Sequence, residues 1–417
     1  ISTLQLSENL EKTVKTIQRM EKWQGHLYNW YDTRTLKPLH PVYISTVDNG
    51  NYVCYLITLV QGLKSYAQGP MFDASLIQGI NDTLMCGQAE HAMIPKELAI
   101  FDDVVVNGEM NLLKWRKSLK TLAETSMLAS TAKQPWRFKV ESMIKTYLRE
   151  IDEYCPWLSL IENPGIQCTD EVSIQALDQL TRLLTLPIRL EDAQDFYTVV
   201  FRLIETLEST ELSHNETAKT WLSDLKLAMM QSHASIDRHI RSVERLIQQD
   251  ETLSWETKFG VLYEPSKQHF SIGYHVAEQK LTNSYYDLFA SESRQTSFIA
   301  ISRGEIPPKH WFMLGRSLTL VNRYKGLVSW SGTMFEYLMP LLIMKNFRNT
   351  LLDETYSFVI KSQMKYGTQR GMPWGTSESG YNVLDSHMDY QYKAIGVPWL
   401  GLKRGLIEDA VCAPYAT

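Results

Sequence analysis

Helical periodicity through the middle of the chain is the feature that most constrains its fold. Apolar residues recur there at the spacing of an α-helix, and prolines at positions 135, 156, 164 and 187 break the pattern. The periodic segments that we expect to be helices are 107–132, 137–153, 170–186, 191–209 and 214–250. Residues 67–213 carry no recognisable chemical motif, so we interpret them as a variable helical region that contributes packing.

The two ends of the chain carry further helical segments separated by loops rich in glycine and aromatic residues. Residues 259–274 alternate as two short strands around a turn at 264–267, which predicts a hairpin flap. The helices predicted outside the middle region are 7–24, 51–64, 284–303, 308–315, 332–346 and 351–367. Paired helices with polar aromatic loops between them predict an all-α fold, an α/α toroid or barrel whose loops build a site at one end.

Composition excludes several classes of protein. The 417 residues are 44% hydrophobic and 21% charged, and the net charge of −5 argues against a surface that binds nucleic acid. Five cysteines without a CxxC pair give no zinc site or disulfide framework, and His233 and Asp237 share a helical face without a third ligand, so no metal is expected. The longest apolar run is interrupted at Pro340, and we expect this piece to be soluble.

The aromatic content is high, with 11 Trp, 21 Tyr and 13 Phe, many of them beside Gly, Asn or Asp. Aromatic faces next to hydrogen-bonding groups suit a carbohydrate, although a large core also contains many aromatic side chains. Residues 25–34 include Tyr28 and Trp30 and lack any period, so they read either as a loop over a cleft or as a loop packed on the core.

Glu292 stands out among the acidic residues. In the helix predicted for 284–303, an apolar face contains this carboxylate, and its members are Tyr285, Leu288, Phe289, Glu292, Thr296 and Ile299. Burying a carboxylate is costly unless it is paired, protonated or used chemically. A salt bridge with Arg316 or Arg303 and a catalytic role are both open interpretations. Asp287 fits a capping box with Ser284 and is expected to start the helix.

Three further acidic residues are candidates for a site. Glu378 lies in the segment 373–381, a loop of small residues flanked by Trp374 and Tyr381, where it is either a catalyst or a solvated glutamate. Glu336 either binds a sugar hydroxyl or favours the start of its helix, and Asp48 is well placed, together with Asn49, to cap the helix 51–64. Two carboxylates across a sugar groove are what cleavage of a glycosidic bond requires. Phosphate-binding, GxSxG and HExxH motifs are absent from the sequence.

Several strings resemble the glycoamylase-like domain of bacterial cyclic β-1,2-glucan synthases. They are GHLYNWYDTRTLKPL, YISTVDNGN, FGVLYEPSKQHFSIGY, LTNSYYDLFASESRQTSFIAISRGEIP, HWFMLGR, LVSWSGTMFEYLMPLL, PWGTSESGYN and YQYKAIGVPWLGLKRGL. The resemblance covers about residues 20–62 and 256–417. It implies a single (α/α)6 catalytic domain over 1–417 that cyclises linear β-1,2-glucan by transglycosylation with retention.

The same resemblance implies roles for individual residues. Glu292 is expected to be the acid/base and Glu378 the nucleophile, with no metal and no cofactor. The residues expected to bind linear and cyclic β-1,2-glucan are Tyr28, Trp30, Asp48, Asn51, Tyr286, Arg316, Trp330, Glu336, Trp374 and Tyr381. In this family the domain is part of a larger membrane-anchored synthase, so we expect it at the cytoplasmic face of the inner membrane and expect the barrel to continue beyond residue 417.

Two other functions stay open. An inverting endo-β-1,2-glucanase on the same barrel would use a water between more widely spaced carboxylates. A non-catalytic glucan-binding domain would need neither glutamate for chemistry. Products formed from linear β-1,2-glucan distinguish the three.

Overall fold

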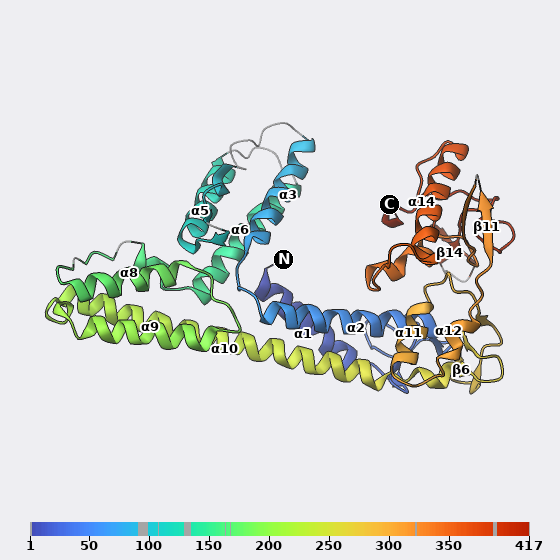
Figure 1. The fold of residues 1–417 in the computed structure, drawn as a ribbon, viewed down its shortest axis with the longest axis horizontal. Helices are drawn as coiled ribbons and strands as arrows, with labels where there is room; N and C mark the ends of the chain where they lie inside the picture. The colour runs from blue at the N-terminus through green and yellow to red at the C-terminus, as the bar shows by residue number, and fades with distance from the viewer. Residues whose placement is uncertain are drawn as a thin grey trace. The chain divides into compact units, whose positions relative to one another are not determined.

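A computed structural model describes residues 2–90, 99–106, 108–128, 135–162, 164–166, 168–321, 323–386 and 390–416. The chain divides into two compact units, and Figure 1 colours the chain by residue number from the N-terminus to the C-terminus. Unit 1 contains residues 1–15 and 61–248, and unit 2 contains residues 16–60 and 249–417. The region predicted to be variable, 67–213, lies entirely in unit 1. That both units act as one catalytic domain stays a prediction.

Unit 1 consists mainly of helices. Its elements, three of which also contain residues of unit 2, are α1 (Thr3–Arg19), α2 (Thr46–Ala67), α3 (Ala74–Glu90), η1 (Ala99–Phe101), β4 (Val105–Val106), β5 (Glu109–Met110), α5 (Leu112–Leu128), α6 (Pro135–Tyr154), α7 (Leu158–Ile161), α8 (Glu171–Thr185), α9 (Ala193–Glu208), η2 (Glu211–His214) and α10 (Glu216–Glu256). The helices predicted for 137–153, 170–186, 191–209 and 214–250 are confirmed within a few residues. The one predicted for 107–132 is confirmed over α5 but is wrong at its start, where Glu109 and Met110 form strand β5, and 129–132 lie outside the described residues.

One continuous apolar core holds unit 1 together. Trp115, Leu119, Ile151, Leu184 and Val200 are each fully buried in it. These residues come from α5, α6, α8 and α9, whose apolar faces recur at helical spacing and therefore pack inward together.

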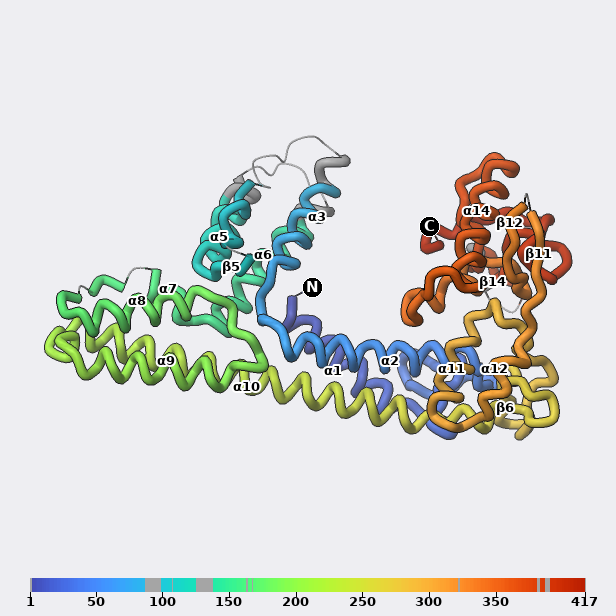
Figure 2. Tube along the Cα trace, viewed as in Figure 1, coloured from blue at the N-terminus to red at the C-terminus, as the bar shows by residue number. Residues whose placement is uncertain are grey.

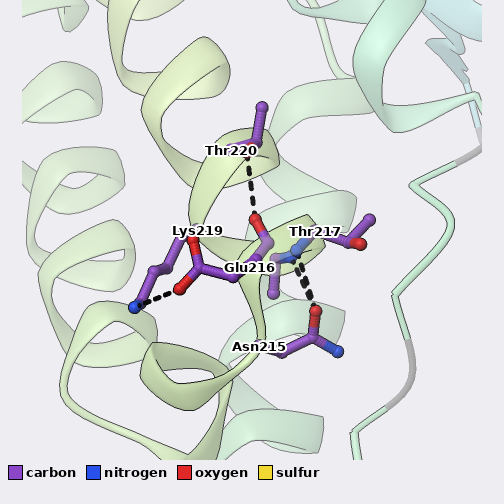
Figure 3. A network of polar contacts seen from close by, with 6 residues as sticks. Asn215, Glu216, Thr217, Lys219 and Thr220 are labelled. Carbon is purple, nitrogen blue, oxygen red and sulfur yellow. Dashed lines mark hydrogen bonds and ion pairs between the residues drawn. The ribbon is translucent and has the colours of Figure 1, made fainter.

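The start of α10 is fixed by its own sequence. The backbone N–H groups of Thr217 and Ala218 donate to the Asn215 side chain at 2.9 and 3.2 Å, and Lys219 pairs with Glu216 at 2.7 Å (Figure 3). An asparagine that accepts from the first free N–H groups is a typical N-terminal cap.

Unit 2 combines short strands with short helices. Its elements are β1 (Lys22–Trp23), β2 (His26–Leu27), β3 (Tyr43–Ser45), η3 (Phe259–Leu262), β6 (Tyr263–Glu264), β7 (His269–Ser271), β8 (Gly273–His275), β9 (Lys280–Leu281), β10 (Tyr285–Tyr286), α11 (Arg294–Ser302), α12 (Lys309–Met313), β11 (Leu318–Val321), β12 (Tyr324–Leu327), α13 (Met334–Leu338), η4 (Met339–Leu342), α14 (Leu351–Arg370), β13 (Glu378–Leu384), β14 (Tyr390–Ala394) and η5 (Pro414–Ala416). The predicted hairpin is confirmed, because β6 pairs antiparallel with β7 with Tyr263 opposite Phe270.

Two smaller apolar cores lie in unit 2. One contains Ile44, Val53, Phe259 and Phe270, and the other contains Phe289, Leu327, Tyr337, Val359 and Leu400. Figure 2 shows α14 beside β11 and β12, the elements that surround the second core. A predominantly helical fold with small sheets is therefore confirmed for the described residues. Among the described helices, none has the length and apolar content needed to cross a membrane.

The helix predicted for 284–303 is wrong in its first half. Tyr285 and Tyr286 form strand β10, which pairs with Ser271 and Phe270 of β7, and the helix begins only at Arg294. Tyrosine favours strands, and the open edge of β7 supplies the partner that the local pattern could not reveal. The apolar face that was to hold Glu292 therefore does not exist, and Asp287 caps no helix.

The second helix also begins earlier than predicted. Its first residue is Thr46, and the Asp48 N–H donates to the Ser45 hydroxyl at 3.3 Å. Asp48 and Asn49 therefore lie inside the first turn and do not cap it. The Asn49 side chain instead accepts from the Leu27 N–H at 2.8 Å, which ties β2 to the helix.

Candidate active site

Glu292 lies in a tight turn between β10 and α11. Its carbonyl accepts from the Gln295 N–H at 3.1 Å. Arg294, two residues after Glu292, is almost fully buried. It donates to the Tyr356 hydroxyl at 2.7 Å and to the Tyr337 carbonyl at 3.2 Å. These bonds attach the start of α11 to α14 and α13, so the turn holds Glu292 in one place.

Burial dominates the electrostatics of Glu292. Burial is the largest cause, and together with the carboxylates of Glu378, Asp48 and Glu336 it raises the pKa of this carboxyl to about 8. The Asn51 amide opposes them by donating to Glu292 Oε2 at 3.2 Å. Glu292 is therefore mostly protonated at neutral pH, which is the state a general acid needs.

The salt-bridge interpretation of Glu292 is wrong. Within the described part of the chain, neither candidate arginine pairs with it. Arg303 donates to the Ser254 carbonyl at 2.9 Å, and Arg316 donates to the Trp311 carbonyl at 2.8 Å while its guanidinium stacks on Phe289.

Glu378 is the first residue of β13, opposite Ala394 of β14, and so it lies at the end of its glycine-punctuated loop. The Tyr392 hydroxyl, from the facing strand, donates to Glu378 Oε2, and the Tyr415 hydroxyl donates to the Glu378 carbonyl at 2.9 Å. Burial is the largest cause that raises the pKa of Glu378, and the carboxylates of Glu336 and Asp48 also raise it. The hydrogen bond from Tyr392 and the charge of Lys403 lower this pKa. Glu378 is partly buried rather than a freely solvated glutamate.

Glu336 has a structural role that accounts for its burial. It forms a capping box with Thr333 at the start of α13, and its Oε2 also accepts from the Ser329 hydroxyl at 2.8 Å and the Ser331 N–H at 3.0 Å. Its helix-start interpretation is thereby supported. Its charge still reaches the site, because it raises the pKa of Glu292 and of Glu378.

Asp48, Glu292, Glu336 and Glu378 therefore form what we name the carboxylate cluster. Asp48 is exposed on the first turn of α2 and raises the pKa of both Glu292 and Glu378. Tyr286 belongs beside this cluster, since burial raises the pKa of its hydroxyl and Glu292, Asp48 and Glu378 raise it further. The fold thus brings together side chains from five parts of the chain that are distant in sequence, namely α2, β10, the turn before α11, α13 and β13.

The predicted aromatic residues have different environments. Trp330 is 45% exposed and donates to Asp287 at 3.1 Å, and Trp30 is 49% exposed, so both present ring surface to solvent. Tyr28 is buried in the first core of unit 2 and Trp374 packs against the second, which makes both packing residues in this structure. The side chain of Tyr381 lies outside the described residues.

The sequence analysis missed three residues next to the predicted pair: Gln295, Tyr392 and Tyr415. Tyr392 lies within one of the quoted strings, and its contact with Glu378 depends on the register of β13 against β14. Gln295 donates to Asn51, a contact visible only once α11 is known to begin at Arg294.

Comparison with known proteins gives one informative match. No protein-family profile matches the chain. The chain is 33% identical, over 98% of its length, to the cyclic β-(1,2)-glucan synthase NdvB of Rhizobium meliloti (strain 1021), and it spans 13% of the length of that relative. The match confirms the resemblance seen in the sequence: the chain is a relative of one domain of the cyclic β-1,2-glucan synthases.

Proposed function

We propose that unit 2 carries the active site of a transglycosylase that cyclises linear β-1,2-glucan with retention of anomeric configuration. The observation that supports this most is the state of Glu292, a carboxyl with a pKa of about 8 in the same cluster as Glu378. Glycoside cleavage needs one protonated and one ionised carboxyl at the same bond. Burial raises the pKa of Glu378, and the hydrogen bond from Tyr392 and the charge of Lys403 act against this rise and favour the ionised form.

In the first step, Glu378 attacks the anomeric carbon while Glu292 gives its proton to the departing glycosidic oxygen. The bond from that carbon to the oxygen breaks, and an ester to Glu378 forms. The leaving part of the glucan departs as a neutral alcohol, and Glu292 is left as a carboxylate.

In the second step, a 2-hydroxyl at the far end of the same glucan attacks the anomeric carbon and gives its proton to Glu292. The ester breaks, Glu378 returns to its carboxylate form, and a closed ring results. Because donor and acceptor belong to one molecule, the effective concentration of the acceptor is high enough for it to compete with water.

The remaining predicted residues are proposed to bind the chain. Trp30 and Trp330 would stack on glucose rings from the surface, and Asp48 and Tyr286 would bind hydroxyls beside the carboxylate cluster. We keep Tyr28, Asn51, Arg316, Glu336, Trp374 and Tyr381 as proposed contacts of the glucan path. Of these, Tyr28 and Trp374 would act mainly by supporting the walls of the site, because both pack in cores.

We also propose the finer architecture that the resemblance implies. Residues 1–417 would form a single catalytic domain built on an (α/α)6 toroid of the glycoside hydrolase type, within a larger membrane-anchored synthase, at the cytoplasmic face of the inner membrane. A determined structure of a longer segment of the protein would test the toroid directly.

Product analysis on linear β-1,2-glucan tests the function. The proposal predicts cyclic products without reducing ends, with the β configuration retained and no steady rise in reducing sugar. Accumulating reducing ends with inversion would identify a hydrolase. Binding of the glucan without any product would identify a binding domain.

A further inference from the structure

We propose that Gln295 is a positioning residue for this reaction: it fixes the orientation of the Asn51 amide so that the acid proton of Glu292 is held on Oε1. This inference rests on the proposed function. It also gives Asn51 a role in orienting the acid, in addition to its proposed contact with glucan.

The orientation of the Asn51 amide follows from the acceptors around Gln295. The Gln295 side chain is almost fully buried, and its Nε2 donates to Asn51 Oδ1 at 2.9 Å and to Met339 Sδ at 2.9 Å. A thioether sulfur accepts hydrogen bonds and never donates them, so the nitrogen of Gln295 must face it. Asn51 then presents its oxygen to Gln295 and its nitrogen to Glu292.

The consequence for Glu292 is chemical. Its Oε2 accepts an N–H from Asn51 at 3.2 Å, and the unprotonated oxygen of a carboxylic acid is the better acceptor of the two. The acid proton is therefore placed on Oε1, which leaves one defined oxygen to face the leaving group. General acid catalysis depends on such a fixed direction of proton transfer.

We name the two hydrogen bonds from Gln295 to Asn51 and from Asn51 to Glu292 the relay. The helices that carry it, α2 and α11, lie in close contact. A Cβ atom at Gly50 of α2 would lie 1.7 Å from the Thr296 hydroxyl oxygen of α11, so only glycine allows the two helices to come this near. Asn51 follows Gly50 in α2, and Gln295 precedes Thr296 in α11. The close approach therefore brings their amides within hydrogen-bond distance.

The other charged and titratable groups near Glu292 do not replace Asn51. They are Asp48 of α2, Glu336 of α13, Glu378 of β13, Tyr286 of β10, Tyr392 of β14 and Tyr415 of η5. The three carboxylates raise the pKa of Glu292, whereas the Asn51 amide lowers it. Weakening the Asn51 hydrogen bond should therefore raise the pKa of Glu292.

The test uses Gln295→Met, which keeps the length of the side chain and removes the amide. Without its fixed partner the Asn51 amide turns, so the alkaline limb of the kcat profile, which reports loss of the Glu292 proton, should move up by about half to one pH unit. We expect kcat to fall about tenfold with KM nearly unchanged. Gln363→Met is the matched control, because Gln363 is equally buried in unit 2 but bonds Thr376.

A second readout separates this inference from the proposed function. The Glu292 carboxyl is titrated by carbon-13 NMR in the 417-residue chain, assigned by its loss in Glu292→Gln, and Gln295→Met should raise its pKa whether or not the chain acts on glucan. A chain without transferase activity but with this shift contradicts the function and supports the relay. An active chain whose alkaline limb and Glu292 titration are unchanged in Gln295→Met overturns the relay.

Asn51→Leu keeps the test decisive if Gln295→Met does not fold. It removes the donor to Glu292 directly and should raise the pKa of that carboxyl in the same way. An unchanged titration in Asn51→Leu also overturns the relay.

Discussion

Unit 1 and unit 2 bury different kinds of side chain. Unit 1 encloses one long apolar core, and most of its buried polar residues are serines. Unit 2 has two smaller cores and a much larger set of buried polar groups, among them Arg294, Gln295, Glu336 and Gln363. Buried polar groups are tolerated only when they are hydrogen-bonded, and together these bonds fix geometry.

The difference shows that the sequence of unit 1 mainly determines packing, whereas the sequence of unit 2 also determines the positions of polar groups. The helices of unit 1 follow local periodicity and need only mutual packing. The turns and strands of unit 2 place carboxylates from distant parts of the chain in one cluster, where burial changes the pKa of two of them. We therefore expect changes in unit 1 to affect stability and changes in unit 2 to affect chemistry.

The largest effect should come from the proposed catalytic pair. Glu292→Gln and Glu378→Gln each keep size and remove the ionisable group, and each should lower kcat by about 10²- to 10⁴-fold, measured as cyclic product formed per unit time. Glu244→Gln, at an exposed position on α10 in unit 1, is the control and should leave the rate unchanged. Full activity in either variant would remove that residue from catalysis.

The next effect is on stability alone. Leu184 is fully buried in the core of unit 1, so Leu184→Ala should lower the free energy of unfolding by about 2–5 kcal/mol, measured by urea titration. Leu227→Ala, at a side chain that is 55% exposed, should change it by less than about 0.5 kcal/mol. If Leu184→Ala also shifts the pH profile of kcat in the folded protein, the proposed difference between the two units is wrong.

A smaller effect on chemistry is expected at Tyr392. Its hydroxyl lowers the pKa of Glu378, so Tyr392→Phe should raise that pKa and move the acidic limb of the profile up by about one unit. The sign follows because the nucleophile must be ionised and would now lose its proton only at higher pH. Tyr415→Phe removes a bond to the Glu378 main chain instead, so an equal shift there would contradict this account.

The smallest effect compares two glycines of the same helix. Gly50→Ala forces α2 away from Thr296 and should lower the free energy of unfolding by about 1–3 kcal/mol. A Cβ atom at Gly62 meets nothing within 4 Å, so Gly62→Ala should raise stability by up to about 1 kcal/mol. Equal effects in thermal unfolding would show that α2 and α11 do not touch as described.

Local sequence patterns were sufficient to predict most of unit 1. The helices α6, α8 and α9 follow apolar repeats bounded by prolines, and these signals act over a few residues. The same reasoning failed at 284–293, where pairing of Tyr285 and Tyr286 with β7 overrides a helical pattern. A strand partner distant in sequence leaves no local signal.

The site was only partly predictable for the same reason. Glu292 and Glu378 were singled out from their local sequence, but the helical argument for Glu292 was wrong, so of the two arguments for Glu292 only the family resemblance is left. The supporting contacts of Tyr392 and Gln295 depend on the register of β13 and on the close approach of α2 and α11. Such contacts follow from tertiary packing and cannot be inferred from spacing.

The most direct measurement is a crystal structure of the Glu292→Gln protein with linear β-1,2-glucan bound. The account predicts that residues 292 and 378 lie on opposite sides of one glycosidic bond, with their side-chain carbonyl or carboxyl carbons about 5–5.5 Å apart, as a retaining mechanism requires. A separation of about 6.5–9.5 Å with a water between them, or a glucan bound away from Glu378, would contradict it.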